Sequence, residues 1–577
     1  MNASLPDQPR IELAIVDNSV KRADRGGFVW LSVGAASPPQ PKGGMSEGPA
    51  AVGTRLVRRD RGASIACIDQ RDPTAPSLHL WRGLFSSYDW FVATSSDGQV
   101  TVSDDFRSAL ASLPVADRTP SEDGIIQHYL YRTVFGTGTY ISRIRRLGAG
   151  EHLEIDVALG STTGGLIDRA ASETDLVEPA QYLDVVEAAL ESIVAPLRHR
   201  PDVQLSFSGG VDSTLLARLL GSDVRMTTVV PGTPEFAVET SYARLSARLL
   251  DMPLEELVTS EQSYLGLLES TIDDTGRPPR HDIIPLISLP FRDRAGDVFV
   301  IGEGADGYFG TGGRAAKIAN YLRQQHLRGM AAGIARLAPS GIRARATMVV
   351  ARGAQFAADP LSAEGFAATA EVYGDPSFIR RVAGPDKADD MLLSILQYTL
   401  DRVDMSVPND PFYQHLELAQ WQDAFADHIR IHREAARAHR AELVAPFVME
   451  PMITALSRLP VADRHLKGFT GKWLMKEMLS ARLPAYQVDK RKLHTSLPFK
   501  RYCTDGPLTR IWDRYEIPDL FEGKDREGLI ANSSDEGVLW NAISHAIWDA
   551  RVVQNASLTP NVPIVSISIE AGQDPDG

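Results

Sequence analysis

The sequence predicts an α/β protein, with an N-terminal β-rich domain followed by a parallel-sheet domain that carries a helical lobe. Three observations predict this class. Short runs of β-forming residues, separated by turns, fill residues 1–178. From residue 179 strands alternate with helices, as in a parallel sheet with helices on both faces. From residue 314 to about 483 apolar residues fall mostly at helical spacing. We therefore expect domains at residues 1–178 and 179–555, and a flexible tail at residues 556–577.

In the N-terminal part, β-branched and aromatic residues gather in the runs FVWLSVGA, ASIACID, DWFVATSS and QVTVSDD, which predict strands. The stretch from Gly34 to Gly53 is rich in Pro and Gly and predicts a loop. GEHLEIDVALGSTTGG, from Gly150, predicts a hairpin that closes this part.

The second part begins with helical periodicity at residues 181–199. The elements expected next are a strand at 203–207, a helix at 213–221, a second strand at 224–230, a helix at 241–250 and a third strand at 297–302.

The composition limits the class of protein. The 577 residues are 43% hydrophobic and 23% charged, which is typical of a globular chain with large cores. A net charge of −14 disfavours nucleic-acid binding, which needs a basic surface. Only Cys67 and Cys503 are present, and so few cysteines in a long chain indicate a reducing compartment. Because no signal peptide or membrane span is visible, we expect a soluble, cytoplasmic protein.

The most informative segment is LSFSGGVDSTLLARLL, from Leu205 to Leu220, where an apolar strand passes through a polar turn into a helix. Such a turn exposes backbone N–H groups at the positive end of the helix dipole, which suits phosphate. Gly209 and Gly210 allow the backbone to approach an anion closely. Asp212 stands where a Walker loop would have Lys, and a carboxylate beside a polyphosphate requires a divalent cation between them. The turn therefore predicts a nucleotide with Mg²⁺, and a plain glycine-rich capping turn is the alternative.

A second acidic turn, IGEGADGYFG, follows the strand DVFV. Ligands of open α/β sheets bind outside the carboxyl ends of the strands, so we expect both turns at one edge of the sheet. Asp306 could then supply a second carboxylate to the same metal, with Glu303 nearby.

These residues resemble the asparagine synthetase superfamily of ATP pyrophosphatases. SGGVDS, from Ser208, is similar to that family's signature loop, and GEGAD, from Gly302, to its second metal loop. Later segments also resemble family motifs: VETSYARLSARLL from Val238, AELVAPFVMEPMITALSRLP from Ala441, and GKWLMKEMLSARLPAYQVDKRKLHTSLPF from Gly471. The resemblance covers about residues 180 to 505 and implies an ATP-pyrophosphatase fold for the second domain.

The resemblance also implies a reaction. The family uses ATP with Mg²⁺ to adenylate a carboxylate, releases pyrophosphate, and lets an amine attack the acyl-adenylate to give an amide and AMP. Asp212 and Asp306 would hold Mg²⁺. The residues expected to bind the nucleotide are Ser206, Ser208, Gly209, Gly210, Val211, Asp212, Ser213, Val230, Gly302, Glu303 and Lys472.

Two further residues are implied in catalysis. Lys492 would stabilise the charge that develops in both half-reactions, with a surface lysine of the basic run DKRK as the alternative. Glu442 would orient or deprotonate the attacking amine, with a solvated helix residue as the alternative. Lys472 could reach a phosphate or lie on a helix face.

The departures from the family are also informative. Glutamine-dependent asparagine synthetases begin with a cysteine just after the initiator methionine, where this chain has Asn2. The resemblance therefore implies a degenerate Ntn-hydrolase-like domain at residues 1–178 without glutaminase activity. Gly307 and Met449 stand where asparagine synthetases carry acids, which argues against aspartate as the substrate.

Family members without glutaminase activity usually join a carboxylate and an amine of one substrate. β-Lactam-forming synthetases have Tyr three residues before the second metal Asp, where this chain has Glu303. Lasso peptide macrolactam cyclases share the degenerate N-terminal domain and similar length, although their second loop is commonly G-G-D and here it is G-A-D. We expect a lasso cyclase, which joins the N-terminal amine of a precursor peptide to an Asp or Glu side chain. A peptide substrate would imply a leader peptidase and a leader-binding protein as partners.

Other functions stay open. An ammonia-dependent asparagine synthetase, or another amide ligase of secondary metabolism, fits the same motifs. A non-catalytic nucleotide-binding scaffold is disfavoured because Asp212, Asp306, Lys492 and Glu442 are all present. A sulfur-transferring or tRNA-modifying enzyme would need reactive cysteines near the site and a basic face, and this acidic chain offers neither.

Overall fold

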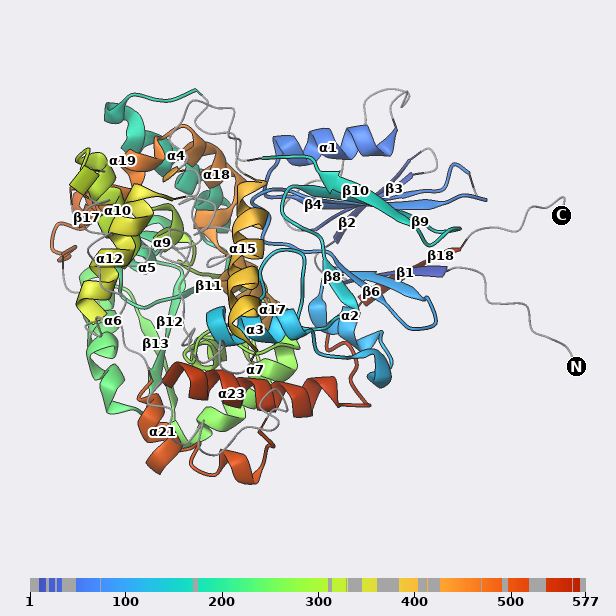
Figure 1. Ribbon diagram of the computed structural model, residues 1–577. Helices are drawn as coiled ribbons and strands as arrows, with labels where there is room; N and C mark the ends of the chain where they lie inside the picture. The colour runs from blue at the N-terminus through green and yellow to red at the C-terminus, as the bar shows by residue number, and fades with distance from the viewer. Residues whose placement is uncertain are drawn as a thin grey trace, which may run out of the picture.

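The computed structural model has one parallel sheet with its helices on one side of the molecule and two mainly antiparallel sheets on the other (Figure 1). The predicted α/β class is therefore confirmed. The structure describes residues 10–16, 20–25, 28–33, 48–72, 74–169, 175–309, 314–327, 329–330, 345–360, 383–402, 412–413, 426–468, 470–489, 497–517, 536–562 and 564–570.

The two N-terminal sheets enclose a core between them, which contains Leu13 and Val102 of one sheet and Ile68, Leu80 and Ile155 of the other. The first sheet has the order β18-β1-β7-β6-β8, with strands at Ile564–Glu570, Arg10–Val16, Val100–Ser103, Phe91–Thr94 and Ile144–Arg146. The second has the order β10-β9-β5-β4-β3-β2, with strands at Thr162–Leu166, Glu151–Asp156, Ser77–Arg82, Ser64–Asp69, Phe28–Val33 and Val20–Arg25. Neighbouring strands are antiparallel except β1 and β7, which are parallel.

The structure differs from the sequence prediction at two places in this part. Pro49–Gly53, predicted as loop, belongs to helix α1, Pro49–Arg59, because its buried face packs on the sheet: the Gly53 backbone lies against Trp81. The earlier residues of that loop, 34–47, lie outside the described residues. Within the tail predicted as flexible, Ile564–Glu570 is strand β18, paired antiparallel along the whole of β1.

The third sheet is entirely parallel and has the order β13-β12-β11-β14-β15. Its strands are Leu254–Thr259, Arg225–Pro231, Val203–Ser206, Val298–Val300 and Glu442–Val444. β13 was not predicted, because its acidic residues interrupt the apolar pattern and it lies at the sheet edge, where solvent accepts them. The central strand β11 has β12 on one side and β14 on the other, and such a position is where α/β sheets bind ligands.

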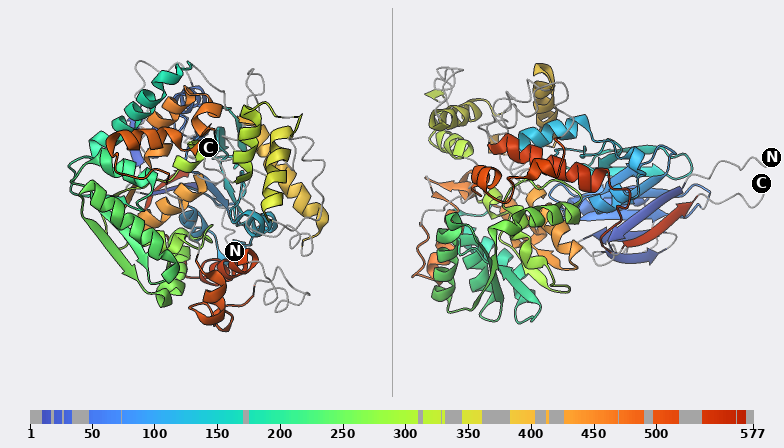
Figure 2. Two further views of the ribbon diagram at one scale, coloured as in Figure 1. Left: turned by 90° about the vertical axis from the view of Figure 1, so that its left-hand side faces the viewer. Right: turned by 90° about the horizontal axis from the view of Figure 1, so that it is seen from below.

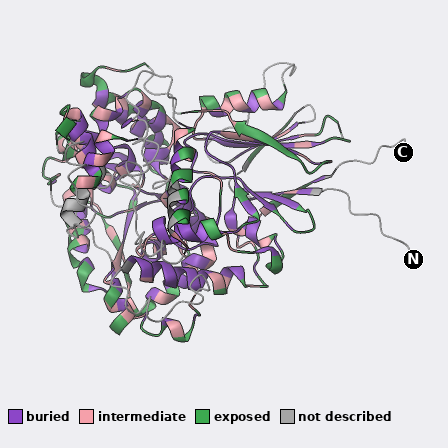
Figure 3. Ribbon diagram, in the orientation of Figure 1, coloured by how far each residue is buried: buried purple, intermediate pink, exposed green. Residues whose placement is uncertain are grey.

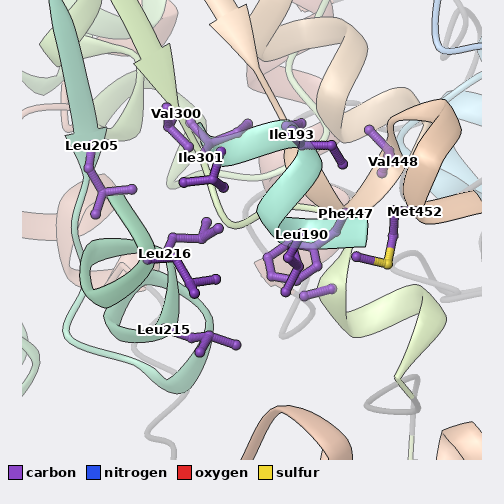
Figure 4. Packing of buried hydrophobic residues seen from close by; sticks show 14 of the residues in the cluster. Leu190, Ile193, Leu205, Leu215, Leu216, Val300, Ile301, Phe447, Val448 and Met452 are labelled. Atoms are coloured by element: carbon purple, nitrogen blue, oxygen red, sulfur yellow. The ribbon is translucent and has the colours of Figure 1, made fainter. Parts of the chain in front are cut away.

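Five helices share a core with this sheet and pack against one another. They are α4 (Tyr182–Val194), α5 (Val211–Leu220), α6 (Ala237–Leu250), α18 (Glu450–Ser457) and α20 (Trp473–Arg482). Figure 4 shows Leu190 and Ile193 of α4 beside Met452 of α18, with Leu215 and Leu216 of α5 on the same core. Burying such side chains stabilises the fold by about 1.5–3 kcal/mol each.

A layer of helices joins the parallel sheet to the N-terminal sheets. α2 (Phe106–Ala111) and α3 (Glu122–Tyr131) come from the N-terminal part, whereas α7 (Tyr264–Thr275), α17 (Ala426–Ala438) and α23 (Glu536–Trp548) come from the second part. Residues of α2, α3, α7 and α23 form one continuous core. In Figures 1 and 2, α23 lies beside both α3 and α7. The two parts of the chain therefore share buried surface.

The remaining helices surround the sheet. α10 and α12 pack against each other and belong to the predicted helical lobe. Their bounds, with those of the other helices and of a small hairpin, are α8 Ile284–Ile287, α9 Ala305–Tyr308, α10 Arg314–Gln324, α12 Arg345–Ala358, α15 Pro385–Leu400, α19 Val461–His465, α21 Phe499–Asp505, β16 Leu466–Lys467 and β17 Thr470–Gly471. Buried residues line the inside of these layers and exposed ones their outer faces (Figure 3). Within the described ranges no helix has the length and hydropathy that crossing a membrane requires.

Candidate functional site

The polar turn after β11 is held in one shape by its own hydroxyls. Ser213 Oγ accepts a hydrogen bond from the Ser208 N–H at 3.3 Å and lies 3.2 Å from Ser208 Oγ. Ser208 Oγ in turn accepts from the Gly210 N–H at 3.3 Å. The turn leads directly into the first residue of α5 at Val211. Backbone donors and hydroxyls therefore gather at the positive end of a helix, which is the arrangement that binds phosphate.

Gly209 is required by the approach of α6 to this turn. Its φ is +68°, and a Cβ there would lie 2.6 Å from Ala243 Cα and from the Tyr242 carbonyl oxygen. The Gly209 carbonyl accepts hydrogen bonds from Tyr486 Oη at 2.8 Å and Ser246 Oγ at 3.0 Å. The sequence predicts that this glycine lets an anion approach, whereas its close neighbour in the structure is the α6 backbone.

The second acidic turn follows β14 and lies against the first. A Cβ on Gly302 would be 3.2 Å from Asp212 Cβ. Gly304 has a φ of +90°, and a Cβ there would come 2.3 Å from Val448 Cγ1, so only glycine fits. Asp306 then lies in the first turn of α9, beside Asp212. The prediction that both turns meet at one edge of the sheet is correct, because β11 and β14 are neighbouring parallel strands.

Lys472 brings a buried cation to the two carboxylates. Its Nζ lies 2.7 Å from Asp306 Oδ1 and also forms a close ion pair and hydrogen bond with Asp212 Oδ2. Burial by itself would lower the pKa of Lys472, but the carboxylates of Asp212 and Asp306 outweigh it and hold the pKa above its usual value. The backbone fixes the side chain, because Lys472 caps α20 at a φ of +55° and its N–H donates to the Phe309 carbonyl at 2.8 Å.

A cavity of about 270 Å³ opens beside these turns. Its polar end contains residues of both turns: Ser206, Ser208, Asp212, Ser213, Gly302, Glu303 and Asp306. Its walls are largely apolar, with Val229, Pro231, Phe236, Ile283, Leu286, Ile287, Pro290 and Phe291. A cavity with clustered polar groups at one end and an apolar body is typical of a small-molecule or cofactor site.

Two polar side chains of the cavity have no hydrogen-bond partner among the described residues. Ser206 Oγ is buried, and no described residue hydrogen-bonds to it. His432 of α17 is 3% exposed, and neither of its ring nitrogens has a hydrogen-bond partner within the described part of the chain. A buried polar group without a partner costs about 1–3 kcal/mol, so a bound ligand is the natural partner.

The carboxylates also fit a nucleotide-bound Mg²⁺. In the described residues no group of three or more His, Cys, Asp or Glu side chains could hold a metal by itself. Mg²⁺ in nucleotide sites needs only one or two carboxylates, because the phosphates supply further oxygen ligands. Asp212 and Asp306, each within ion-pair distance of one ammonium group, can present oxygen atoms to a shared cation.

Some predicted site residues do not line the cavity: Gly209, Gly210 and Val211 belong to the first turn without lining it, and Lys472 reaches the site through Asp212 and Asp306. Glu442 is the first residue of β15 and pairs with Val298, the first residue of β14, so it lies at the amino end of the sheet, opposite the two turns. It is exposed there, and its position contradicts a role beside the amine. Val230 is not among the lining residues, although Val229 and Pro231 are. Lys492 lies outside the described residues.

Two residues near the site were not predicted. Tyr486 donates to the Gly209 carbonyl, and burial raises the pKa of its hydroxyl to about 12. His432 shares the buried face of α17 with Ile429 and Ala436, at helical spacing. The only sequence signal for it is a histidine on an apolar stripe, which also describes an ordinary core histidine.

Neither cysteine is among the residues that line this cavity. Cys67 is fully buried in β4, and burial raises the pKa of its thiol, so it is not a ready nucleophile. Cys503 is partly buried in α21.

Comparisons with known proteins agree with this geometry. Residues 185–551 match the family model of asparagine synthase. A protein of Mycobacterium tuberculosis described as a putative asparagine synthetase (glutamine-hydrolyzing) is 23% identical over 545 residues, covering 88% of this chain and 79% of the relative. A Mycobacterium bovis protein with the same description matches to the same extent.

Proposed function

The chain belongs to the asparagine synthase family, and we propose that it is an ATP-dependent ligase that adenylates a carboxylate, releases pyrophosphate, and forms an amide with release of AMP. One observation carries the proposal most directly: Lys472 pairs with both Asp212 and Asp306. The three residues lie beside the polar turn after β11, at the carboxyl ends of the neighbouring strands β11 and β14. This arrangement places two acids and a fixed cation where the phosphates of a nucleotide would lie.

The residues of the first turn would bind the pyrophosphate part of ATP. Ser208 and Ser213 supply hydroxyl donors, and the amino end of α5 adds a positive potential. Asp212 and Asp306 would hold Mg²⁺, which would supply positive charge to offset the negative charge of the phosphates. Lys472 holds a positive charge at the same place, and this charge stabilises the oxygen atoms as pyrophosphate leaves.

The carboxylate substrate would occupy the remainder of the cavity. A free carboxylate is a poor acyl donor, and the adenylate converts its oxygen into a good leaving group. Amine attack then forms the C–N bond while the electrons of the acyl C–O bond leave with AMP, and the proton that the amine loses passes to the leaving phosphate or to water. Glu303 is the acidic side chain of the second turn that lines the cavity beside Asp306, and it replaces Glu442 as the carboxylate available on the acyl side.

We assign the carboxylate and the amine to one peptide, so that the product is a macrolactam of the lasso type. The apolar walls support this choice, because Phe236, Leu286 and Phe291 offer contact area that a small amino acid would not use. Gly307 and Met449, in place of acids, point the same way. A leader peptidase and a leader-binding protein would then act with this chain.

Ammonia-dependent asparagine synthesis is the second candidate, and the family match favours it. Ammonia from glutamine hydrolysis in the N-terminal part is not proposed, because Cys67 is buried within a sheet and its thiol stays protonated.

The test measures AMP and pyrophosphate from ATP–Mg²⁺ with two substrate pairs, and identifies the products by mass spectrometry. The first pair is aspartate with ammonium. The second is a linear lasso-type peptide with a free N-terminal amine and an internal Asp or Glu. AMP with a peptide lighter by one water supports the macrolactam, whereas asparagine with an equal amount of AMP replaces it with asparagine synthesis. If the protein also fails to bind an ATP analogue with Mg²⁺, the ligase proposal is wrong.

A further inference from the structure

His432 is a buried histidine that lines the cavity and has no hydrogen-bond partner in the described part of the chain. It is 3% exposed and lines the cavity with Phe291, whose ring lies edge-on at 6.4 Å between centroids. Neither Nδ1 nor Nε2 has a hydrogen-bond partner among the residues described. His128 and His545, which are also buried in the helical layer, differ from His432 because each has a hydrogen-bond partner. His128 Nε2 lies 3.1 Å from the Asn541 carbonyl oxygen, and His545 Nδ1 lies 3.3 Å from Tyr129 Oη.

The two faces of α17 explain how His432 reaches the cavity. Arg430 and Arg433 point to the N-terminal sheets, where Arg430 pairs with Asp89 and Arg433 donates to the Ser87 carbonyl at 2.5 Å. His432 lies with Ile429 on the face that belongs to the core of the parallel sheet. The arginines therefore fix the position of α17, and this position keeps the His432 imidazole at the wall of the cavity.

The order of the strands indicates which part of a ligand His432 would meet. The phosphate-type turn follows β11, in the middle of the sheet. The cavity wall on one side comes from β12 and α6, with Val229 and Thr240. On the other side lie Ile301 and Glu303, which follow β14, and α17, which packs against β15. When the nucleotide lies along the side formed by β12 and α6, the opposite side of the cavity stays available for the acyl group and the amine. Glu303 and His432 line that opposite side.

We propose that His432 accepts a hydrogen bond from the amine that attacks the acyl-adenylate, and thereby selects and orients a neutral amine. The inference rests on the proposed function and adds the residue that positions its nucleophile. An imidazole in an apolar wall attracts an uncharged N–H donor and disfavours an ammonium ion, which would have to lose its hydration.

The protonation state agrees with this role. Burial lowers the pKa of His432 to about 4, so the ring is neutral at pH 7 and one nitrogen is available as an acceptor. A nitrogen with so low a pKa is a weak base, so His432 orients the amine and does not keep its proton.

The test compares His432→Leu, His432→Gln and the control His128→Leu. If His432 serves a ligand, His432→Leu removes an unpaired polar group, and the melting temperature stays the same or rises by about 1–2 °C. His128→Leu removes a partnered imidazole and should lower it. A melting temperature that falls as much in His432→Leu as in the control would make His432 a structural residue and overturn the proposal.

Two functional readouts locate the contact. By calorimetry, the affinity of His432→Leu for the Mg²⁺ complex of a non-hydrolysable ATP analogue should stay within twofold of the wild type. With the substrate pair that yields amide in the wild type, kcat/KM for amide formation should fall at least tenfold while adenylation, measured by pyrophosphate exchange, persists. His432→Gln should restore part of the loss.

Other results overturn the inference. A tenfold loss of nucleotide affinity would place His432 on the nucleotide, and an unchanged rate of amide formation would remove its role. Failure of the wild type to bind the nucleotide analogue would instead reject the proposed function, so the two failures are distinguishable.

Discussion

At the residue scale, the polar turn after β11 contains two glycines that differ in how well the structure would tolerate a side chain. Gly209 has a positive φ and touches the α6 backbone, so a side chain there is strained and also collides. Gly210 has a φ of −74°, and the nearest atom to an added Cβ is Ser208 Oγ at 3.3 Å. A side-chain hydroxyl can shift by the few tenths of an ångström that this contact requires, whereas a helix backbone cannot.

We therefore expect Gly209→Ala to destabilise the protein and Gly210→Ala to have much the smaller effect. The conformational strain at Gly209 alone costs about 1 kcal/mol, and the collision with Ala243 adds to it. Thermal unfolding of the two variants measures the difference. Equal melting temperatures would mean that α6 does not press on the turn as the geometry requires.

Asp212 and Asp306, which pair with Lys472, should be essential for the formation of AMP and pyrophosphate. Glu442, at the amino end of the sheet, should not be essential. Asp212→Asn removes one of the charges around Lys472 and should reduce AMP and pyrophosphate formation by about 10²-fold or more while the circular dichroism spectrum is retained. Glu442→Gln is the matched control and should leave the rate within twofold, because Glu442 lies at the amino ends of the strands. A large loss in Glu442→Gln would restore the role that the sequence predicts for it.

At the element scale, α3 and α23 meet through buried histidines. Burial lowers the pKa of His128 to about 4 and that of His545 to about 3, the latter with a further contribution from the neighbouring His128. Both values lie below the 6.5 of an unperturbed histidine, so the unfolded chain binds more protons. Stability from these groups is therefore complete above about pH 6.5 and is lost as the pH falls towards the folded values.

Acid should accordingly weaken the contact between α3 and α23. His545 alone contributes a loss of about 2 kcal/mol in the free energy of unfolding between pH 7 and pH 5. We expect His545→Leu to remove this part of the pH dependence, so its urea midpoint falls less than that of the wild type over the same interval. If the two pH profiles are parallel, His545 takes up its proton in the folded protein as readily as in the unfolded chain.

The elements also show which features a single sequence can predict. The SGGVDS and GEGAD turns were found because their chemistry is contained in a few consecutive residues. Lys472 was named from a motif, but its contact with Asp212 joins residues far apart in the chain, which no local pattern records. Glu442 was misplaced because a motif does not tell which end of a short strand faces the ligand. The edge strand β13 was missed because its acids resemble a loop.

At the scale of the whole molecule, the two ends of the described chain meet in one sheet. β18 pairs with β1 from Ile564↔Val16 to Glu570↔Arg10, and Ile569 is buried in the core between the N-terminal sheets. Local sequence could not predict this strand, because its partner lies at the other end of the chain. β18 covers the edge of β1, which would otherwise be free to pair with another molecule, and is itself the outer strand of the sheet.

Removal of residues 563–577 should therefore destabilise the protein and promote its association. The deletion exposes the β1 edge and loses the buried Ile569 side chain, which alone contributes about 1.5–3 kcal/mol. We expect a lower melting temperature and larger species in size-exclusion chromatography. A control that deletes only the residues after Glu570 keeps β18 intact and should behave as the full chain. Because the cavity proposed to bind the nucleotide is built on the parallel sheet, affinity for an ATP analogue with Mg²⁺ at 25 °C should persist in both deletions. If the longer deletion leaves the melting temperature unchanged, the C-terminal segment is the flexible tail that composition alone predicts, and β1 forms the outer strand of its sheet.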